Sequence, residues 1–160
     1  NGEERPMIAG VRYAHTNVIA KDWRALAEWY VEQFGCERVL PERDLSGPAM
    51  EAGTGVPGAT LKGIHLRLPG HGPNGPTIEI FSYGSMPEPV ATDIHRPGYG
   101  HIAFQVADVA AARATVLAAG GRAIGEVVTT SVDEDRVVTW CYVTDPEGNA
   151  VELQAWGKAH

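Results

Sequence analysis

Three things are scarce in this chain, and each scarcity excludes a class of protein. The 160 residues include only two cysteines, Cys36 and Cys141, too few for a disulfide framework, so we expect both to be buried reduced thiols. No apolar run approaches the roughly 20 residues that cross a bilayer. No signal peptide is visible either, so we expect a cytoplasmic protein. Basic residues are outnumbered, and the formal net charge of −7 argues against binding nucleic acid or an anionic membrane.

The chain does contain enough apolar residues for a full core. Hydrophobic residues make up 44% of the sequence and charged residues 21%, which is ordinary for a globular protein. The length fits one domain or two small, closely packed halves.

The sequence repeats itself. Tyr13-Ala14-His15 opens one extended run, and Tyr99-Gly100-His101 opens another 86 residues later. Each run is followed by a helix-like stretch that ends in glycine, at Gly35 and at Gly121, again 86 residues apart. This spacing predicts two copies of one structural unit.

Each half closes on a strand with a single acidic residue among apolar ones. These residues are Glu79 and Glu152, which are 73 residues apart. The smaller offset means that the first half carries 13 extra residues between its helix and its last strand. The segment 45–58 is rich in glycine and proline and is the expected place for them, with room for one short helical turn.

Periodicity predicts a β-α-β-β-β order in each half, hence an α+β fold. The expected organisation is an N-terminal arm at 1–10, a first module at 11–84, a linker at 85–97 and a second module at 98–157. Helices are expected at 23–34 and 108–119, and strands at 11–19, 38–43, 61–68, 77–83, 101–106, 126–132, 136–143 and 150–156.

Alternation along these strands separates an apolar face from a polar one. In 77–83, for example, Ile78 and Ile80 point one way while Glu79 points the other. If a helix covers the apolar face of each sheet, the opposite faces need cover. Two such sheets facing each other would form a curved, partly open, eight-stranded barrel-like sheet that holds the polar residues inside.

Four residues at repeat-related positions belong to that polar interior: His15, Glu79, His101 and Glu152. Two neutral imidazoles and two carboxylates balance the charge of a divalent ion, which limits the cost of burying it. Mixed nitrogen and oxygen donors suit Ni, Co, Mn, Mg, Zn or Fe. We therefore predict a divalent metal site made of these four side chains.

The same residues carry a resemblance. Gly98-Tyr-Gly-His101-Ile-Ala-Phe-Gln-Val and Asp145-Pro-Glu-Gly-Asn-Ala-Val-Glu152-Leu resemble motifs of the vicinal oxygen chelate superfamily, which includes glyoxalases, bleomycin-resistance proteins and extradiol dioxygenases. The resemblance covers nearly all of 11–156. It implies paired βαβββ modules and a divalent metal that chelates neighbouring oxygens of a small substrate.

Within that superfamily, the ligand pattern is most similar to that of glyoxalase I, which presents His or Gln, Glu, His and Glu. The resemblance implies a lyase or isomerase that transfers a proton next to a carbonyl through a metal-stabilised enediolate. Glu152 is the first choice as ligand and base, with Glu79 as its mirror.

Three alternatives remain open. One is a methylmalonyl-CoA-epimerase-like or secondary-metabolism tailoring enzyme, although such epimerases usually have Gln where this chain has Glu79. Another is an extradiol-type dioxygenase using His15, His101 and Glu152. The third is a non-catalytic protein that sequesters an antibiotic or another ligand.

The substrate is expected to contact side chains on the same strand faces. The candidates are His65, Phe81, Tyr83, Tyr99, Gln154 and Trp156. By the resemblance a homodimer is expected, and the site forms either within one chain or by exchange of modules between two chains.

Overall fold

The computed structural model describes residue 2, residues 4–5 and residues 7–160. The predicted arm at 1–10 therefore lies partly outside the described residues. The first module contains β1 (His15–Ile19), α1 (Trp23–Phe34), β2 (Glu37–Leu45), α2 (Pro48–Thr54), β3 (Leu61–Arg67) and β4 (Thr77–Tyr83). The second contains β5 (Ile102–Gln105), α3 (Val109–Ala118), β6 (Ala123–Ser131), β7 (Arg136–Thr144) and β8 (Ala150–Lys158).

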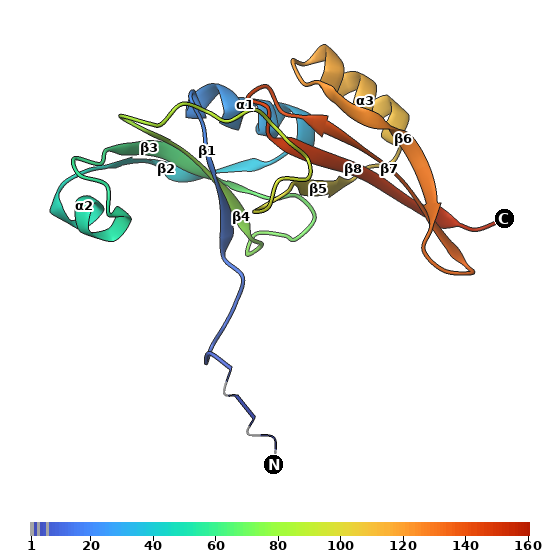
Figure 1. Cartoon of the computed structure of the whole chain (residues 1–160), viewed down its shortest axis with the longest axis horizontal. Coiled ribbons are helices and arrows are strands. Elements are labelled where there is room, and N and C mark those ends of the chain that lie inside the picture. Colours follow the sequence, from blue (N-terminus) through green and yellow to red (C-terminus); the bar gives the residue numbers. More distant parts are fainter. Residues whose placement is uncertain (1, 3, 6) are drawn as a thin grey trace.

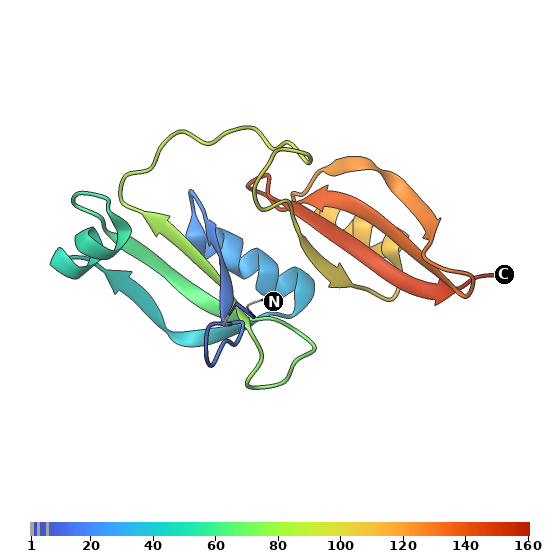
Figure 2. The ribbon, with the colours of Figure 1, turned by 60° about the horizontal axis from the view of Figure 1, so that its bottom comes forward.

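The strands form two four-stranded mixed sheets with the same topology. Their orders are β1-β4-β3-β2 and β5-β8-β7-β6, and in each sheet the first pair is parallel and the others antiparallel. Figures 1 and 2 show the sheets side by side, with α1 and α3 on the same side of both. The α+β prediction of paired modules in a curved, open sheet is confirmed. We call the side without α1 and α3 the open face.

Local sequence explains the helix ends. The side chains of Asp22 and Asp108 each accept a hydrogen bond from the backbone N–H three residues on, which starts α1 and α3. Helix α1 ends at Gly35, whose φ of 68° lies in the left-handed region that glycine adopts without strain. Among the described residues, no helix is long and apolar enough to cross a membrane.

Strand alternation builds the core. The side chains that face the helices are almost fully buried, including Ile64, Ile80, Val151 and Leu153. Both cysteines are buried and free, as expected, and burial raises the pKa of the Cys36 thiol to about 11. The apolar face of each strand therefore packs into the core, and the other face, which carries the candidate ligands, lies on the open face.

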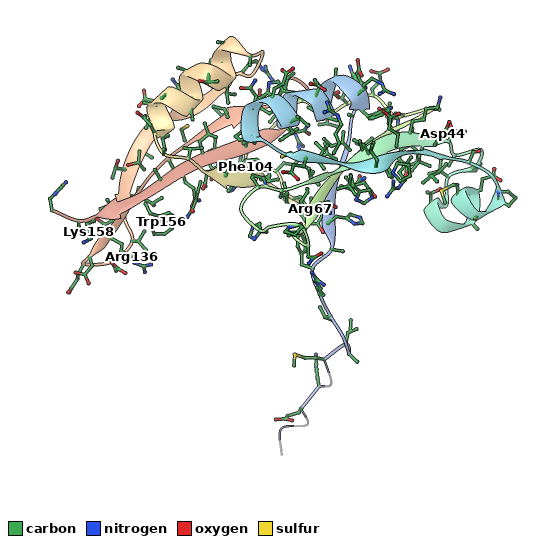
Figure 3. All side chains as sticks on the ribbon, turned by 180° about the vertical axis from the view of Figure 1, so that it is seen from behind. Asp44, Arg67, Phe104, Arg136, Trp156 and Lys158 are labelled. Carbon is green, nitrogen blue, oxygen red and sulfur yellow. The ribbon has the colours of Figure 1, made fainter. Side chains whose placement is uncertain are left out.

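Helix α1 joins the two modules into one core. The ring of Phe34 stacks on that of Phe104 in β5, with centroids 4.0 Å apart, and the Trp29 indole N–H donates to the carbonyl of Ala119. Phe104 lies where the two sheets meet (Figure 3).

A buried carboxylate completes this junction. Asp145 accepts the hydroxyl of Tyr30 at 2.9 Å, and it also accepts the backbone N–H groups of Glu147 and Asn149 and the Asn149 amide. Burial and the Asp145 carboxylate together raise the pKa of Tyr30 well above its usual range. In turn, the Glu147 carboxylate accepts backbone N–H groups at the start of α1. The turn at 145–149 therefore connects the start and the middle of α1 to the second module, and we call this turn with its contacts to α1 the clamp.

The register corrects one detail of the repeat. His65 lies opposite Glu79, and Tyr142 lies opposite Glu152, so Tyr142 is the counterpart of His65. The offset at this strand is 77. Nine of the 13 extra residues therefore precede β3, around α2, and four lie in the β3–β4 turn. Segment 45–58 does not hold them all.

The Tyr30–Asp145 contact gives a test of this junction. Tyr30→Phe removes one charge-assisted hydrogen bond but leaves Asp145 with its other donors, so we expect a loss of about 1–3 kcal/mol in the free energy of unfolding. Urea denaturation measures this, with Tyr99→Phe as the control because Tyr99 is fully exposed. Equal stability of the two variants would show that the clamp contributes nothing.

Candidate metal site

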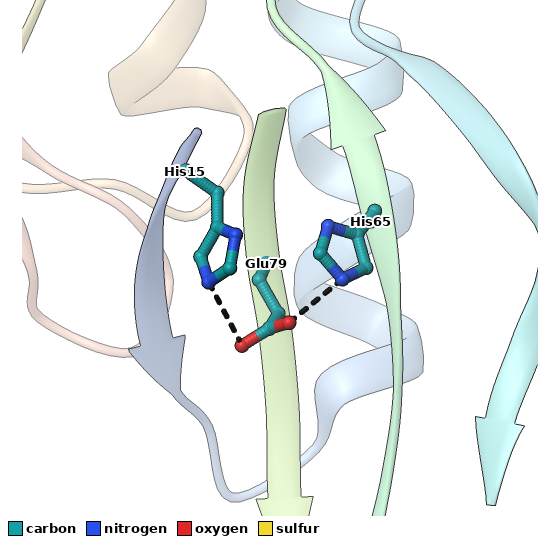
Figure 4. A group of neighbouring side chains, drawn as sticks. All are labelled: His15, His65 and Glu79. Atoms are coloured by element: carbon teal, nitrogen blue, oxygen red, sulfur yellow. Dashed lines mark ion pairs between the residues drawn. The ribbon is translucent and has the colours of Figure 1, made fainter. Parts of the chain in front are cut away.

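Three donor side chains gather on the open face of the first sheet. His15 comes from β1, His65 from β3 and Glu79 from β4, and their ligand atoms all lie within 4.8 Å of one another (Figure 4). The Nε2 atom of His15 is 3.7 Å from Oε1 of Glu79, and Nε2 of His65 is 2.7 Å from Oε2. The first distance is too long for a hydrogen bond and the second is a hydrogen bond.

The surroundings orient Glu79. The side-chain amide of Asn17 donates to Oε1 of Glu79, and Nδ1 of His65 lies 2.9 Å from the Thr77 hydroxyl. Partial burial lowers the pKa of the His65 imidazole, although the Glu79 carboxylate opposes the shift. A neutral His65 that donates from Nε2 to Glu79 can accept the Thr77 hydroxyl at Nδ1.

The second sheet repeats the His–Glu pair. Nε2 of His101 is 3.6 Å from Oε1 of Glu152, almost the spacing of the first pair. Here Gln154 donates to Oε2 of Glu152, the role that Asn17 has in the first module. The Tyr142 ring lies 4.9 Å from that of His101, and burial together with the Glu152 carboxylate raises the pKa of Tyr142.

The structure does not unite the two pairs within one chain. Among the described residues, the His15, His65 and Glu79 group is the only cluster of three or more potential ligands, and His101 and Glu152 are outside it. The reason is the side-by-side arrangement of the sheets, whose open faces point in the same direction (Figure 1). A four-ligand site requires another copy or a rearrangement.

The remaining predicted residues are scattered. Phe81 is 6% exposed and packs with Ala59 and Leu61 beneath the α2 segment, and Tyr83 packs against the same cluster. Tyr99 is fully exposed at the rim of a cavity of about 560 Å³ between β1 and the linker. Gln154 and Trp156 line a separate pocket with Glu152.

Sequence reasoning missed some residues around the site. The sequence predicts His65 as a substrate contact, yet its ring nitrogen lies within 4.8 Å of the potential ligand atoms of His15 and Glu79. Asn17 was missed, although its place two residues after His15 on the same strand face could have revealed it. Tyr142 could not be found without the register of the β7–β8 hairpin.

The donor set fits a divalent ion. Each pair offers one imidazole nitrogen and one carboxylate oxygen, and the carboxylate side chains are only 14% and 15% exposed. In neither pair are the two facing atoms hydrogen-bonded to each other, so each pair can take a cation between them. Neutral imidazole with carboxylate suits several first-row divalent ions.

Comparison with known protein families identifies the superfamily to which the chain belongs. The model of the Glyoxalase/Bleomycin resistance protein/Dioxygenase superfamily matches residues 12–153. The protein therefore belongs to that superfamily, whose members typically bind a divalent metal. A search of curated proteins finds none that matches this chain.

Solved structures share the fold at low sequence identity. A glyoxalase family protein from Bacillus cereus is 15% identical, with a TM-score of 0.75 over 99% of this chain and 100% of that one. A glyoxalase family protein from Enterococcus faecalis is 20% identical, with a TM-score of 0.54 over 91% and 97%. A glyoxylase/bleomycin resistance protein/dioxygenase domain from Frankia sp. is 18% identical, with a TM-score of 0.53 over 93% and 98%.

The contacts of His65 predict its effect on metal binding. Its hydrogen bond to Glu79 fixes the carboxylate, and partners of this kind typically contribute 10–100-fold to metal affinity. We expect His65→Ala to weaken Mn²⁺ or Ni²⁺ binding by about that factor in calorimetric titration. His71→Ala, in the exposed β3–β4 turn, is the matched control. If the two variants bind the metal with equal affinity, His65 contributes nothing to metal binding.

Proposed function

We propose that the protein is a divalent-metal-dependent enzyme of the glyoxalase type, a lyase or isomerase that moves a proton on a carbon next to a carbonyl. The observation that carries this proposal is the pair of repeat-related His–Glu contacts, His15–Glu79 and His101–Glu152, at 3.7 and 3.6 Å on open faces. Nothing in the folding core needs these carboxylates there, whereas a metal-assisted acid–base site does.

The residues that would hold the ion are His15, Glu79, His101 and Glu152. A bound Ni, Zn, Co, Mn, Mg or Fe ion would supply positive charge next to the substrate oxygens, which lowers the cost of removing a proton from the neighbouring carbon.

The protein groups would do the proton transfer. The Glu152 carboxylate accepts the proton from the carbon next to the carbonyl and returns it to the adjacent carbon, and Glu79 offers a second carboxylate on the opposite side. Gln154 and Asn17 hold these carboxylates by hydrogen bonds, so each base presents a fixed oxygen to the substrate.

We also propose that the complete site forms in a homodimer. The open faces of both modules point the same way, so a two-fold axis can lay the second module of one copy over the first module of the other. That arrangement would bring His15 and Glu79 to the partner's pair and cover two faces that are open in the single chain.

One observation favours a second candidate. His15, His65 and Glu79 are two histidines and one carboxylate within one module, the ligand set of non-haem Fe(II) oxygenases. An Fe(II)-dependent dioxygenase acting on a catechol-like ring would use these residues, in place of the set with His101 and Glu152 that the resemblance implies.

Exchange of the carbon-bound proton tests the primary proposal. The panel of substrates contains α-hydroxyketones, hemithioacetals and acyl-CoA thioesters, and NMR in D₂O detects deuterium entering next to the carbonyl. For a substrate that exchanges, we expect Glu152→Gln to reduce the rate about 100-fold or more, the usual contribution of a general base.

The control is Glu134→Gln in the exposed β6–β7 turn, which should exchange at the wild-type rate. Full exchange by Glu152→Gln would contradict the assigned base. If Glu152→Gln binds the ligand as tightly as the wild type and neither protein turns it over, the protein is a sequestering protein. O₂ uptake by the iron-loaded protein with a catechol would favour the dioxygenase.

Complementation tests the shared site. One variant carries His15→Ala with Glu79→Ala, and the other carries His101→Ala with Glu152→Ala. If modules pair between copies, each homodimer lacks a complete site, whereas a mixed dimer regains one. A 1:1 mixture refolded together should hold about a quarter of the wild-type metal after desalting. No recovery in the mixture would show that the site does not form by exchange.

A further inference from the structure

The open face of the second sheet carries a row of aromatic side chains beyond the His101–Glu152 pair. Along β8, Glu152, Gln154 and Trp156 follow one another on this face, about 7 Å apart at two residues per step. Opposite them on β7 lie Tyr142, Trp140 and Val138. Together these six residues line a pocket of about 230 Å³. The pocket therefore has a carboxylate end and an aromatic end.

Hydrogen bonds within the protein fix the two indoles. The Trp156 N–H donates to Oε1 of Gln154 at 2.8 Å, and the Trp140 N–H donates to the hydroxyl of Thr130 at 3.1 Å. The Tyr142 ring packs edge-on against Trp140, with centroids 5.3 Å apart. With both N–H groups occupied, the indoles offer a ligand only their apolar ring surfaces, already held in place.

These aromatics lie outside the buried hydrophobic clusters, whereas the first module buries an aromatic ring on the same face. There, Phe81 lies over Gly63, where an added Cβ would be only 2.2 Å from the ring, and the α2 segment buries Phe81. In the second sheet Trp140 faces Gln154 at the corresponding place, and Trp156 is 47% exposed. Figure 3 shows Trp156 on the side of the sheet away from α3.

The pocket lining also selects against an anionic group. The only charged residue among the six is Glu152, and the nearby guanidinium of Arg136, 5.6 Å from the Trp156 ring, is paired with Asp133. The pocket volume suits part of a ligand, such as one small ring system, rather than a whole one.

We propose that Trp140, Tyr142 and Trp156 form a binding site for a planar, uncharged aromatic ring of the substrate. The substrate oxygens would lie at the Glu152 end of the same face, a part of the inference that rests on the proposed function. The preferred substrates are then aryl-substituted carbonyl compounds, and the aliphatic or anionic members of the same chemical class bind more weakly.

Binding to the metal-free protein tests the ring site directly. The probes are 2-hydroxyacetophenone and hydroxyacetone, which share the hydroxyketone group but differ in the ring, with tetramethylammonium as a cation without a ring. Saturation-transfer NMR and calorimetry on the EDTA-treated full chain measure affinity. We expect the aryl probe to bind at least about tenfold more tightly than either of the others.

Variants locate the site. Trp156→Ala should abolish the preference for the aryl probe, and Trp156→Phe should keep most of it because a ring remains. Trp23→Ala is the matched control, since Trp23 on α1 stacks with Arg24, away from the pocket. Equal affinity for both hydroxyketones, retained preference in Trp156→Ala, or tighter binding of tetramethylammonium would each overturn the proposal.

The two proposals fail separately. If the aryl preference is present but no metal binds and no deuterium is exchanged, the ring site stands and the proposed enzyme class falls. If proton exchange occurs with equal efficiency for aryl and aliphatic substrates, the enzyme class stands and the ring site falls.

Discussion

Asp145 is a buried carboxylate that accepts hydrogen bonds from both halves of the chain, and the arrangement of the two modules depends on it. Its donors are the Tyr30 hydroxyl from α1 and three N–H groups of its own turn. A buried charge is tolerated only when it is fully hydrogen-bonded, so the carboxylate holds α1 against the second module. With the Phe34–Phe104 stack beside it, this clamp keeps the sheets side by side and the open faces in one direction.

The division of each strand into two faces connects folding to chemistry. The face towards the helices is filled by the core, and both His–Glu pairs lie on the other face. There the modules share a His–Glu pair at nearly equal spacing but differ around it. His65 contacts Glu79 in the first module, whereas in the second Tyr142 lies opposite Glu152 and two tryptophans line the same pocket further along the strands. The His–Glu pairs that the modules share suit a metal, and the side chains that differ around them suit recognition of a substrate.

Much of the fold was predictable because it follows from local rules. Helix α1 begins after Asp22, whose side chain caps the first turn, and ends before Gly35, which adopts a left-handed conformation. The alternation around Glu79 and Glu152 places both carboxylates on the face opposite the core. The constant offset of 73 residues between Glu79 and Glu152 cannot identify Tyr142 as the counterpart of His65, because the β3–β4 turn is four residues longer than its equivalent. Phe81 has the right strand phase for a pocket, yet the inserted segment around α2 buries it.

The repeat, the two sheets and the strand faces of the four candidate ligands follow from the sequence, since periods of two and 3.6 residues appear directly in the order of amino acids. Which of those candidate ligands meet depends on the tertiary structure. The distance between the two His–Glu pairs is set by the packing of α1 on the second module and by Asp145, contacts between residues 70 or more positions apart. Such contacts leave no periodic signal in the sequence.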